Sequence, residues 1–478
     1  MISIDKIQTI KEDYSVIILC NKENVNTLSE GILSKKQADY VKNEYAEKNI
    51  DHFSFNELSR YIFVNIVDEC GITYKDTEKY RRLGARILSL CDEKHVKDLQ
   101  IESECHRDTV IAFAEGMMIS SYVFDHYKTD PKRCIHPFDN LHIKHNDIKV
   151  EDLEPMRIVV EATEKCRDLV NEPVTVINAE TLAASIATMA QETDIKVEVW
   201  HKDKIEKEKM GGILAVNRGS SEPPTFTIME YKPENHKNSR PIVLVGKGIV
   251  YDTGGLNIKT GNYMNDMKDD MAGAATMACT LYAAARLHLP LHLIALIPAT
   301  DNRPGENAYA SGDIVNMYDG TNVEVVNTDA EGRMILADAL SYAKQFNPEL
   351  VIDAATLTGA ASRAIGPHGI VAMQQDSESF IEVMKTAGLR TYERVVEFPF
   401  WDEYDDCIKS DIADIKNSGE SYAGMITAGK FLAYFTNYPY IHLDIAGVAF
   451  NEKKDKYNRL GGTGYGIRLL IEFLKIVK

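Results

Sequence analysis

The chain has 478 residues, of which 44% are apolar and 26% are charged, and its formal net charge is −18. This length exceeds what one hydrophobic core usually organises, so we expect a globular protein of two or three domains. The acidic balance disfavours a nucleic-acid partner, because a polyanion needs a basic face.

The sequence also gives no sign of export or of membrane insertion. The segment 1–27 is interrupted by charged residues, so it lacks the apolar centre of a signal peptide. No apolar run approaches the length of about 18 residues that a membrane span needs. Eight scattered cysteines without a CxxC pair favour reduced thiols. We therefore expect a cytoplasmic protein without a membrane partner.

Residues 1–153 are expected to form a smaller N-terminal α/β domain with a role in oligomer formation or regulation. A strand-sized apolar run lies at 15–20, and residues 30–125 are rich in helical patterns with some strands. Apolar residues then recur with helical spacing from Glu154 to Val170. We place the domain boundary at 153/154 and treat this helix as the bridge.

Residues 154–478 are expected to form a catalytic domain, in which short apolar runs alternate with helical stretches. The apolar runs lie at 241–245, 291–297, 350–354 and 440–445, and the helical stretches include 271–287 and 333–346. This alternation predicts a central, mainly parallel or mixed sheet flanked by helices, in an α/β fold. Sites in such sheets form beyond the carboxyl ends of the strands.

Carboxylates stand at three junctions between a predicted strand and a helix. Asp252 follows the run at 241–245, Asp270 precedes one helix, and Asp329 and Glu331 precede another. A single acidic turn can simply complement a helix dipole, but three in one domain favour a shared purpose. Asp329 and Glu331 can converge only if the helix begins between or just after them, because residues two apart on a helix do not face each other.

Crowded carboxylates repel one another and therefore require cations. Two divalent ions would balance four acids, and carboxylate oxygens suit such ions. The four acids are Asp252, Asp270, Asp329 and Glu331. Lys247 and Lys259 lie in the same segments, and a lysine ligates a metal only when it is neutral, as nearby dications favour. The alternative is that both lysines act only as counter-charges.

The heptapeptide Asn327-Thr-Asp-Ala-Glu-Gly-Arg333 matches the signature of the leucyl aminopeptidase (cytosol aminopeptidase) family without a departure. Other motifs resemble that family in order and spacing, and they include Val245-Gly-Lys-Gly, Asp252-Thr-Gly-Gly, Ala355-Thr-Leu-Thr-Gly359 and His442-Leu-Asp-Ile-Ala-Gly447. The resemblance covers roughly residues 160–475.

The resemblance implies a metallo-exopeptidase that releases leucine-like, apolar residues from the free N-termini of short peptides. Two ions, Zn²⁺ or Mn²⁺, would activate water as a hydroxide nucleophile. One metal position would be formed by Lys247, Asp252, Asp270 and Glu331, and the other by Asp252, Asp329 and Glu331. Lys259 would stabilise the oxyanion, and Arg333 would hold a bicarbonate that acts as general base. The family also implies a homohexamer.

The family's pocket for the first side chain of the substrate maps onto Met267, Thr356, Gly359, Ala446 and Ala449. Ala449 is small where some members are bulkier, so the pocket would admit large apolar residues. The alternative is that Met267 and the alanines are ordinary core residues. Asp269 directly precedes Asp270, where the family usually has a neutral residue, so the choice of ligand between these two stays open.

Two other functions compete with the exopeptidase hypothesis. The first is a regulatory protein that binds DNA through its N-terminal domain, as some relatives do, although the net charge of −18 argues against it. The second is a catalytically inactive scaffold, and the complete set of ligand residues argues against that.

Overall fold

The computed structural model describes residues 3–27, 31–69, 73–130 and 139–477. Its contacts divide the chain into two compact units, which are Met1–Glu161 with Lys454–Arg459, and Ala162–Lys453 with Leu460–Lys478. Helix α4 (Val150–Asn171) runs through the division, and the boundary that we predicted at 153/154 lies within this helix. The role of the N-terminal unit stays a prediction.

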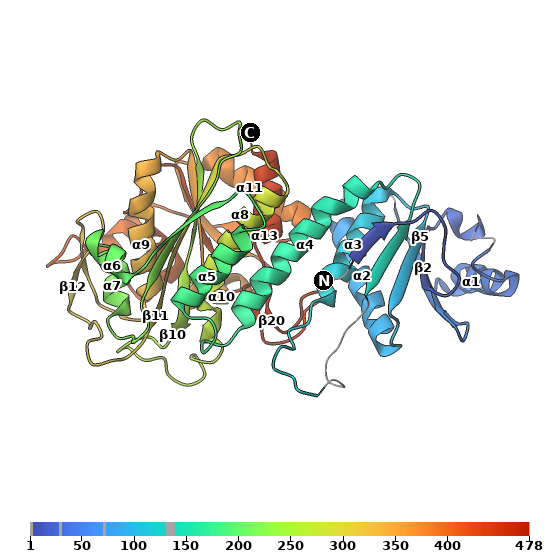
Figure 1. Cartoon of the computed structure of the whole chain (residues 1–478), viewed down its shortest axis with the longest axis horizontal. Coiled ribbons are helices and arrows are strands. Elements are labelled where there is room, and N and C mark those ends of the chain that lie inside the picture. Colours follow the sequence, from blue (N-terminus) through green and yellow to red (C-terminus); the bar gives the residue numbers. More distant parts are fainter. Residues whose placement is uncertain (1–2, 28–30, 70–72, 131–138, 478) are drawn as a thin grey trace. The chain divides into compact units, whose positions relative to one another are not determined.

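The N-terminal unit is a six-stranded sheet with helices on both faces (Figure 1). In sheet order the strands are β1 (Ser3–Lys6), β6 (Asn140–Lys144), β5 (Asp98–Ser103), β2 (Ser15–Asn21), β4 (Tyr61–Val67) and β3 (His52–Asn56). All neighbours are parallel except β3, which runs antiparallel to β4.

Strand β2 explains why this sheet is covered on both sides. Its residues Ser15 to Cys20 are all buried, and successive side chains in a strand point to opposite faces. Val16 and Ile18 belong to the core beneath helix α1 (Lys35–Lys48). Ile17 and Leu19 belong to the opposite core, beneath α2 (Tyr74–Glu93) and α3 (Arg107–Ser121).

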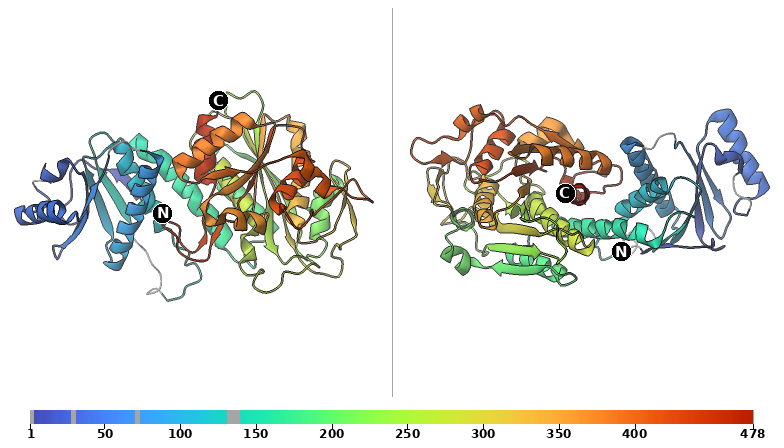
Figure 2. Two further views of the ribbon diagram at one scale, coloured as in Figure 1. Left: turned by 180° about the vertical axis from the view of Figure 1, so that it is seen from behind. Right: turned by 90° about the horizontal axis from the view of Figure 1, so that it is seen from above.

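The C-terminal unit contains a nine-stranded mixed sheet (Figures 1 and 2). Along its main path the strands are β16 (Val395–Glu397), β15 (Ile370–Gln375), β18 (Tyr440–Asp444), β14 (Leu350–Ala355), β9 (Ile242–Gly246), β11 (Leu293–Asn302), β8 (Thr225–Tyr231) and β7 (Lys196–Trp200), and β10 (Gly248–Asp252) pairs with β11. The four strands from β18 to β11 are mutually parallel. Strand β15 is antiparallel to β18 and parallel to β16, and β8 is antiparallel to both β11 and β7.

Helices cover both faces of this sheet, which confirms the predicted α/β class. Val243 and Val245 of β9 pack in one core with α9 (Glu331–Ala343). The opposite face approaches α8 (Ala272–Arg286) so closely that a Cβ on Gly246 would lie 2.6 Å from the Cα of Ala274. The remaining helices are α5 (Ala179–Ala190), α6 (Lys202–Lys207), α7 (Gly211–Asn217), α10 (Gly359–Ile365), α11 (Glu378–Thr391), α12 (Gly424–Ala433) and α13 (Ile467–Ile476).

Smaller elements complete this unit. Strands β12 (Ile314–Asn316), β13 (Asn322–Glu324) and β17 (Ile415–Lys416) form a small sheet, and β19 (Phe450–Asn451) pairs with β20 (Gly461–Gly462). Within the described ranges, no helix combines the length and the apolar character that a bilayer crossing requires. Six cysteines are buried free thiols, while Cys70 and Cys134 lie outside the described residues.

Candidate active site

The acidic junctions predicted from the sequence meet in one cavity of about 500 Å³ in the C-terminal unit. Lys247 directly follows β9, and Asp252 is the last residue of β10. Asp270 lies in a short 3-10 helix, η3 (Met267–Met271), that leads into α8. Glu331 is the first residue of α9, and Asp329 lies in the turn just before it. These five side chains, with Lys259, line the cavity.

Three of the acids lie close enough to share a metal ion. Oxygen atoms of Asp252, Asp329 and Glu331 all lie within 4.8 Å of one another. Asp252 and Glu331 are buried, whereas the side chain of Asp329 is 34% exposed. Because α9 begins at Glu331, Asp329 stays outside the helix and the two side chains can converge.

Lys247 connects two of the acids at the buried end of the cavity. Its Nζ atom lies 2.6 Å from Oδ1 of Asp270 and 3.1 Å from Oε1 of Glu331, and it donates a hydrogen bond of 2.9 Å to the carbonyl of Thr356. Gly332 permits this approach, because a Cβ at that position would lie 2.3 Å from Cε of Lys247.

Lys259 connects the other pair of acids. Its Nζ atom lies 2.7 Å from Oδ2 of Asp252 and 2.7 Å from Oδ1 of Asp329. Two further hydrogen bonds fix the orientation of the Asp252 carboxylate. Its Oδ1 atom accepts hydrogen bonds of 2.8 Å from the Gly254 amide and from Nδ2 of Asn302. Gly254 adopts a φ of 85°, a conformation that favours glycine.

The mutual arrangement of these groups changes their pKa values. Burial, together with repulsion between the carboxylates, raises the pKa of Asp270, Glu331 and Asp329. Burial alone would lower the pKa of Lys247 and Lys259, but the surrounding carboxylates outweigh it and raise both pKa values. Without divalent ions, the two ammonium groups are therefore the counter-charges of the acids.

The donor set fits divalent cations. Two buried oxygens, Oδ2 of Asp270 and Oε2 of Glu331, accept no hydrogen bond from any part of the chain that the structure describes. Buried polar atoms without a partner are costly, so a cation at this position would relieve them. Dications would also reverse the field at Lys247 and favour its neutral, ligating form.

Asp269 and Asp270 both line the cavity, but their surroundings differ. Oδ1 of Asp270 contacts Lys247 and accepts a hydrogen bond of 2.8 Å from the Thr356 hydroxyl. Asp269 forms no ion pair within 4 Å among the described residues, and burial raises its pKa to about 7. The geometry therefore favours Asp270 over Asp269 as the ligand candidate.

Arg333 lies beside the cavity and does not line it. Its guanidinium is 8% exposed and donates a hydrogen bond of 2.8 Å to the carbonyl of Asn417. Its Nε atom has no hydrogen-bond partner among the described residues. Burial lowers the pKa of Arg333 to about 10, which keeps the group cationic at neutral pH.

The structure brings four of the five predicted substrate-pocket residues to the cavity wall, which are Met267, Thr356, Gly359 and Ala446. Ala449 is not among the lining residues. It is 3% exposed, and its carbonyl accepts a hydrogen bond of 2.9 Å from the amide of Thr463.

Sequence reasoning missed two asparagines that support this site. Asn302 ends β11 and bonds to Asp252 and to the carbonyl of Thr328. The side chain of Asn417 accepts a hydrogen bond of 2.9 Å from the Val326 amide and donates one of 2.7 Å to the Asn327 carbonyl. The polar end of the 291–297 run could have drawn attention to Asn302, whereas no local signal marks Asn417, because its partners are about 90 residues away.

Sequence comparison identifies relatives of this chain. Residues 164–471 match the family model described as "Cytosol aminopeptidase family, catalytic domain". A probable cytosol aminopeptidase of Chlorobium limicola is 42% identical over 378 residues, which cover 76% of this chain and 74% of the relative. A probable cytosol aminopeptidase of Geobacter sulfurreducens is 43% identical over 372 residues, which cover 77% of this chain and 75% of the relative.

Solved structures agree with this assignment. The bottromycin maturation enzyme BotP in complex with Mn matches with a TM-score of 0.83 at 27% identity, covering 96% of this chain and 98% of BotP. A mutant of tomato leucine aminopeptidase has the same fold, with a TM-score of 0.84 at 24% identity. The match covers 99% of this chain and 96% of the tomato enzyme. The chain belongs to the cytosol aminopeptidase family and is a metal-dependent hydrolase that acts as an aminopeptidase.

Proposed function

We propose that this aminopeptidase works with two divalent ions and releases leucine-like, apolar residues from short peptides. One observation carries the proposal, namely that two lysines and four carboxylates line one cavity of the C-terminal unit. Lys247 contacts Asp270 and Glu331, and Lys259 contacts Asp252 and Asp329, all at 2.6–3.1 Å.

The residues divide into two overlapping ligand sets. Lys247, Asp252, Asp270 and Glu331 would hold one ion, and Asp252, Asp329 and Glu331 the other. Mostly oxygen donors with one amine suit Zn²⁺ or Mn²⁺. When bound, two such ions supply a water activated at neutral pH and an electrophile for the scissile carbonyl.

The chain itself contributes two cations to the reaction. Lys259 remains protonated beside Asp252 and Asp329, and its side chain is 15% exposed at the cavity, so it can stabilise negative charge on the substrate carbonyl oxygen. Arg333 offers an unpartnered Nε beside the same cavity. It would hold a bicarbonate, and that anion would accept the proton of the attacking water.

The cavity wall supports a preference for apolar side chains. Met267 and Ala446 present apolar groups there, and Gly359 adds no side chain to the wall. Ala449 is buried and does not line the cavity, so in our proposal it affects pocket size only through its neighbours. We also propose a cytoplasmic homohexamer on the strength of the family resemblance, and sedimentation velocity on the purified protein would test the assembly.

Hydrolysis of L-leucine p-nitroanilide tests the activity. We expect cleavage with added Mn²⁺ or Zn²⁺, loss of cleavage on chelation, and recovery when the metal is restored. N-acetyl-L-leucine p-nitroanilide is the matched control, because it lacks only the free amine. Equal cleavage of both substrates, or cleavage that chelation does not reduce, would contradict the proposal.

A further inference from the structure

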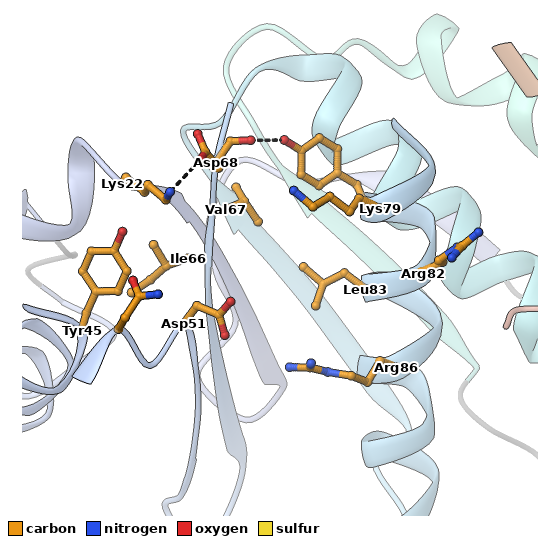
Figure 3. Close-up of a pocket in the computed structure, with 12 residues that line it drawn as sticks. Lys22, Tyr45, Asp51, Ile66, Val67, Asp68, Lys79, Arg82, Leu83 and Arg86 are labelled. Atoms are coloured by element: carbon orange, nitrogen blue, oxygen red, sulfur yellow. Dashed lines mark hydrogen bonds and ion pairs between the residues drawn. The ribbon is translucent and has the colours of Figure 1, made fainter. Parts of the chain in front are cut away.

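A second cavity, of about 410 Å³, lies in the N-terminal unit, well separated in sequence from the metal ligands (Figure 3). It opens at the carboxyl ends of the adjacent parallel strands β2 and β4. Lys22 directly follows β2 and Asp68 directly follows β4, and their side chains form an ion pair of 2.6 Å. The cavity thus occupies the edge at which α/β sheets bind ligands.

The chain leaves these two strands toward opposite faces of the sheet. After β2 it leads to α1, whose Val41 packs in one core. After β4 it leads to α2, whose Leu88 packs in the other core. Neighbouring strands with connections on opposite faces form a switch point, where the diverging connections leave a crevice. Tyr45 of α1 and Leu83 of α2 line this crevice from its two sides.

Two cations of α2 are available to a ligand in this crevice. Lys79 and Arg86 lie seven residues apart, so they share one face of the helix, and both side chains extend toward β4 in Figure 3. Both are exposed, and neither forms an ion pair within 4 Å with any residue that the structure describes. Arg82 also lines the cavity, but it pairs with Glu78 at 2.8 Å and its guanidinium points away from β4.

These cations stand out against an acidic background. Residues 1–161 carry 22 Lys and Arg against 29 Asp and Glu. The acids at the cavity are Asp68, which pairs with Lys22, and Asp51, which lies 2.9 Å from the ring of His52. Apolar side chains, which include Val67 and Leu83, also line the cavity.

We propose that this cavity binds a small phosphomonoester, with its phosphate on Lys79 and Arg86 and its organic body against Leu83, Val67 and Tyr45. A phosphomonoester carries close to two negative charges at neutral pH, which match two unpaired cations. A guanidinium can bind phosphate oxygens in a bidentate manner. Nucleic acid fits less well, because the unit as a whole is acidic.

Isothermal titration of the full-length protein with adenosine monophosphate tests this proposal. Inorganic phosphate and adenosine form the two comparison arms. We expect saturable binding of the monophosphate and no binding of adenosine. If inorganic phosphate binds as tightly as the monophosphate, the result supports a phosphate site and identifies free phosphate as its ligand. Binding of adenosine with equal affinity, or no heat with any probe up to about 10 mM, would overturn the proposal.

Variants on one helix provide the matched control. Lys79→Gln with Arg86→Gln should weaken binding about tenfold or more, because charge-assisted bonds to the phosphate are lost. Arg82→Gln removes a charge from the same helix and should leave affinity unchanged. If the double variant and Arg82→Gln lost the same affinity for the monophosphate, general electrostatics would explain the effect and the proposed site would be overturned. A short DNA duplex that displaces the monophosphate from the unmutated protein, and does not bind the double variant, would instead assign the surface to nucleic acid.

Folding of the variants is checked independently of the ligand. Lys79, Arg82 and Arg86 lie far along the chain from the aminopeptidase site, so each variant should hydrolyse L-leucine p-nitroanilide at the unmutated rate. A double variant with full peptidase activity and unchanged monophosphate affinity is the result that most directly opposes the proposal.

Discussion

The Nζ atom of Lys247 lies 2.6 Å from Oδ1 of Asp270, and the two side chains are only 4% and 6% exposed. This pair joins the end of β9 to the short helix before α8. A buried ion pair of this kind costs desolvation energy. The second carboxylate oxygen of Asp270, Oδ2, has no hydrogen-bond partner among the described residues. The pair is explained if Asp270 is a metal ligand.

Asp270→Asn and its neighbour Asp269→Asn form a matched pair of variants. We expect Asp270→Asn to lower the bound metal by about one ion per chain, because an amide is a weaker ligand than a carboxylate. Asp269→Asn should keep the metal content of the unmutated protein. Metal analysis after gel filtration measures both, and a loss confined to Asp269→Asn would reverse our choice of ligand.

Lys259→Gln should reduce kcat by about 10²- to 10³-fold, which is the usual cost of losing one oxyanion donor. Its metal content should remain unchanged, because Lys259 is not in either proposed ligand set. Steady-state kinetics and metal analysis on the same preparation separate the two effects. A parallel loss of metal would show that Lys259 serves the metal centre itself.

Gly332→Ala should impair the site without touching a polar group. The new methyl would lie 2.3 Å from Cε of Lys247, which would force Lys247 away from Asp270 and Glu331. Overpacking of this kind costs about 1–3 kcal/mol of stability, and metal affinity should fall as well. Gly424→Ala is the control, since its methyl would meet only Ala360 at 3.5 Å. Equal metal affinity in both variants would count against the role of Lys247 as a ligand.

His442→Gln should change how stability depends on pH. Burial alone would lower the pKa of His442, but the carboxylate of Asp353, 2.8 Å away, outweighs it and raises the pKa above 6.5. Tyr440 also donates a hydrogen bond to Asp353, while Asp444 raises and Arg333 lowers the same pKa. The folded state therefore holds the proton more tightly than the unfolded state does.

The stabilisation from this protonated histidine is complete below the unfolded-state pKa of 6.5 and disappears as the pH rises through the higher folded-state pKa. We expect His442→Gln to cost about 3 kcal/mol or more in mildly acid solution, because Asp353 then loses its buried counter-charge. The difference from the unmutated protein should shrink in alkaline solution. Denaturant unfolding across this range measures it, and a difference that stays constant with pH would disprove the assignment.

The acidic residues of the site could be predicted from the sequence because the residues next to each of them determine where the local element begins or ends. The motif from Asn327 to Arg333 fixes where α9 starts, and the start of that helix decides whether Asp329 and Glu331 can converge. The central parallel strands were predicted for the same reason, since their apolar runs are buried on both faces. The structure lengthens one of them, because β11 continues beyond the run at 291–297 to Asn302.

Other features depend on pairing between distant segments. Strands β7 and β16 lie at the sheet edges, and their half-exposed patterns resemble surface segments in the sequence. The contact of Arg333 with Asn417 joins residues that are 84 positions apart. The cavity beside Lys79 and Arg86 requires the order of β2 and β4 in the sheet, which no local pattern encodes.

Counting the metal ions is the most direct test of the central claim. Protein stripped of metal, reloaded with Mn²⁺ or Zn²⁺ and freed of excess ions should hold two ions per chain by elemental analysis. Glu331→Gln should lower both occupancies, because Glu331 belongs to both ligand sets. Unmutated protein that binds one ion or fewer per chain while cleaving L-leucine p-nitroanilide at full rate would contradict the two-metal account.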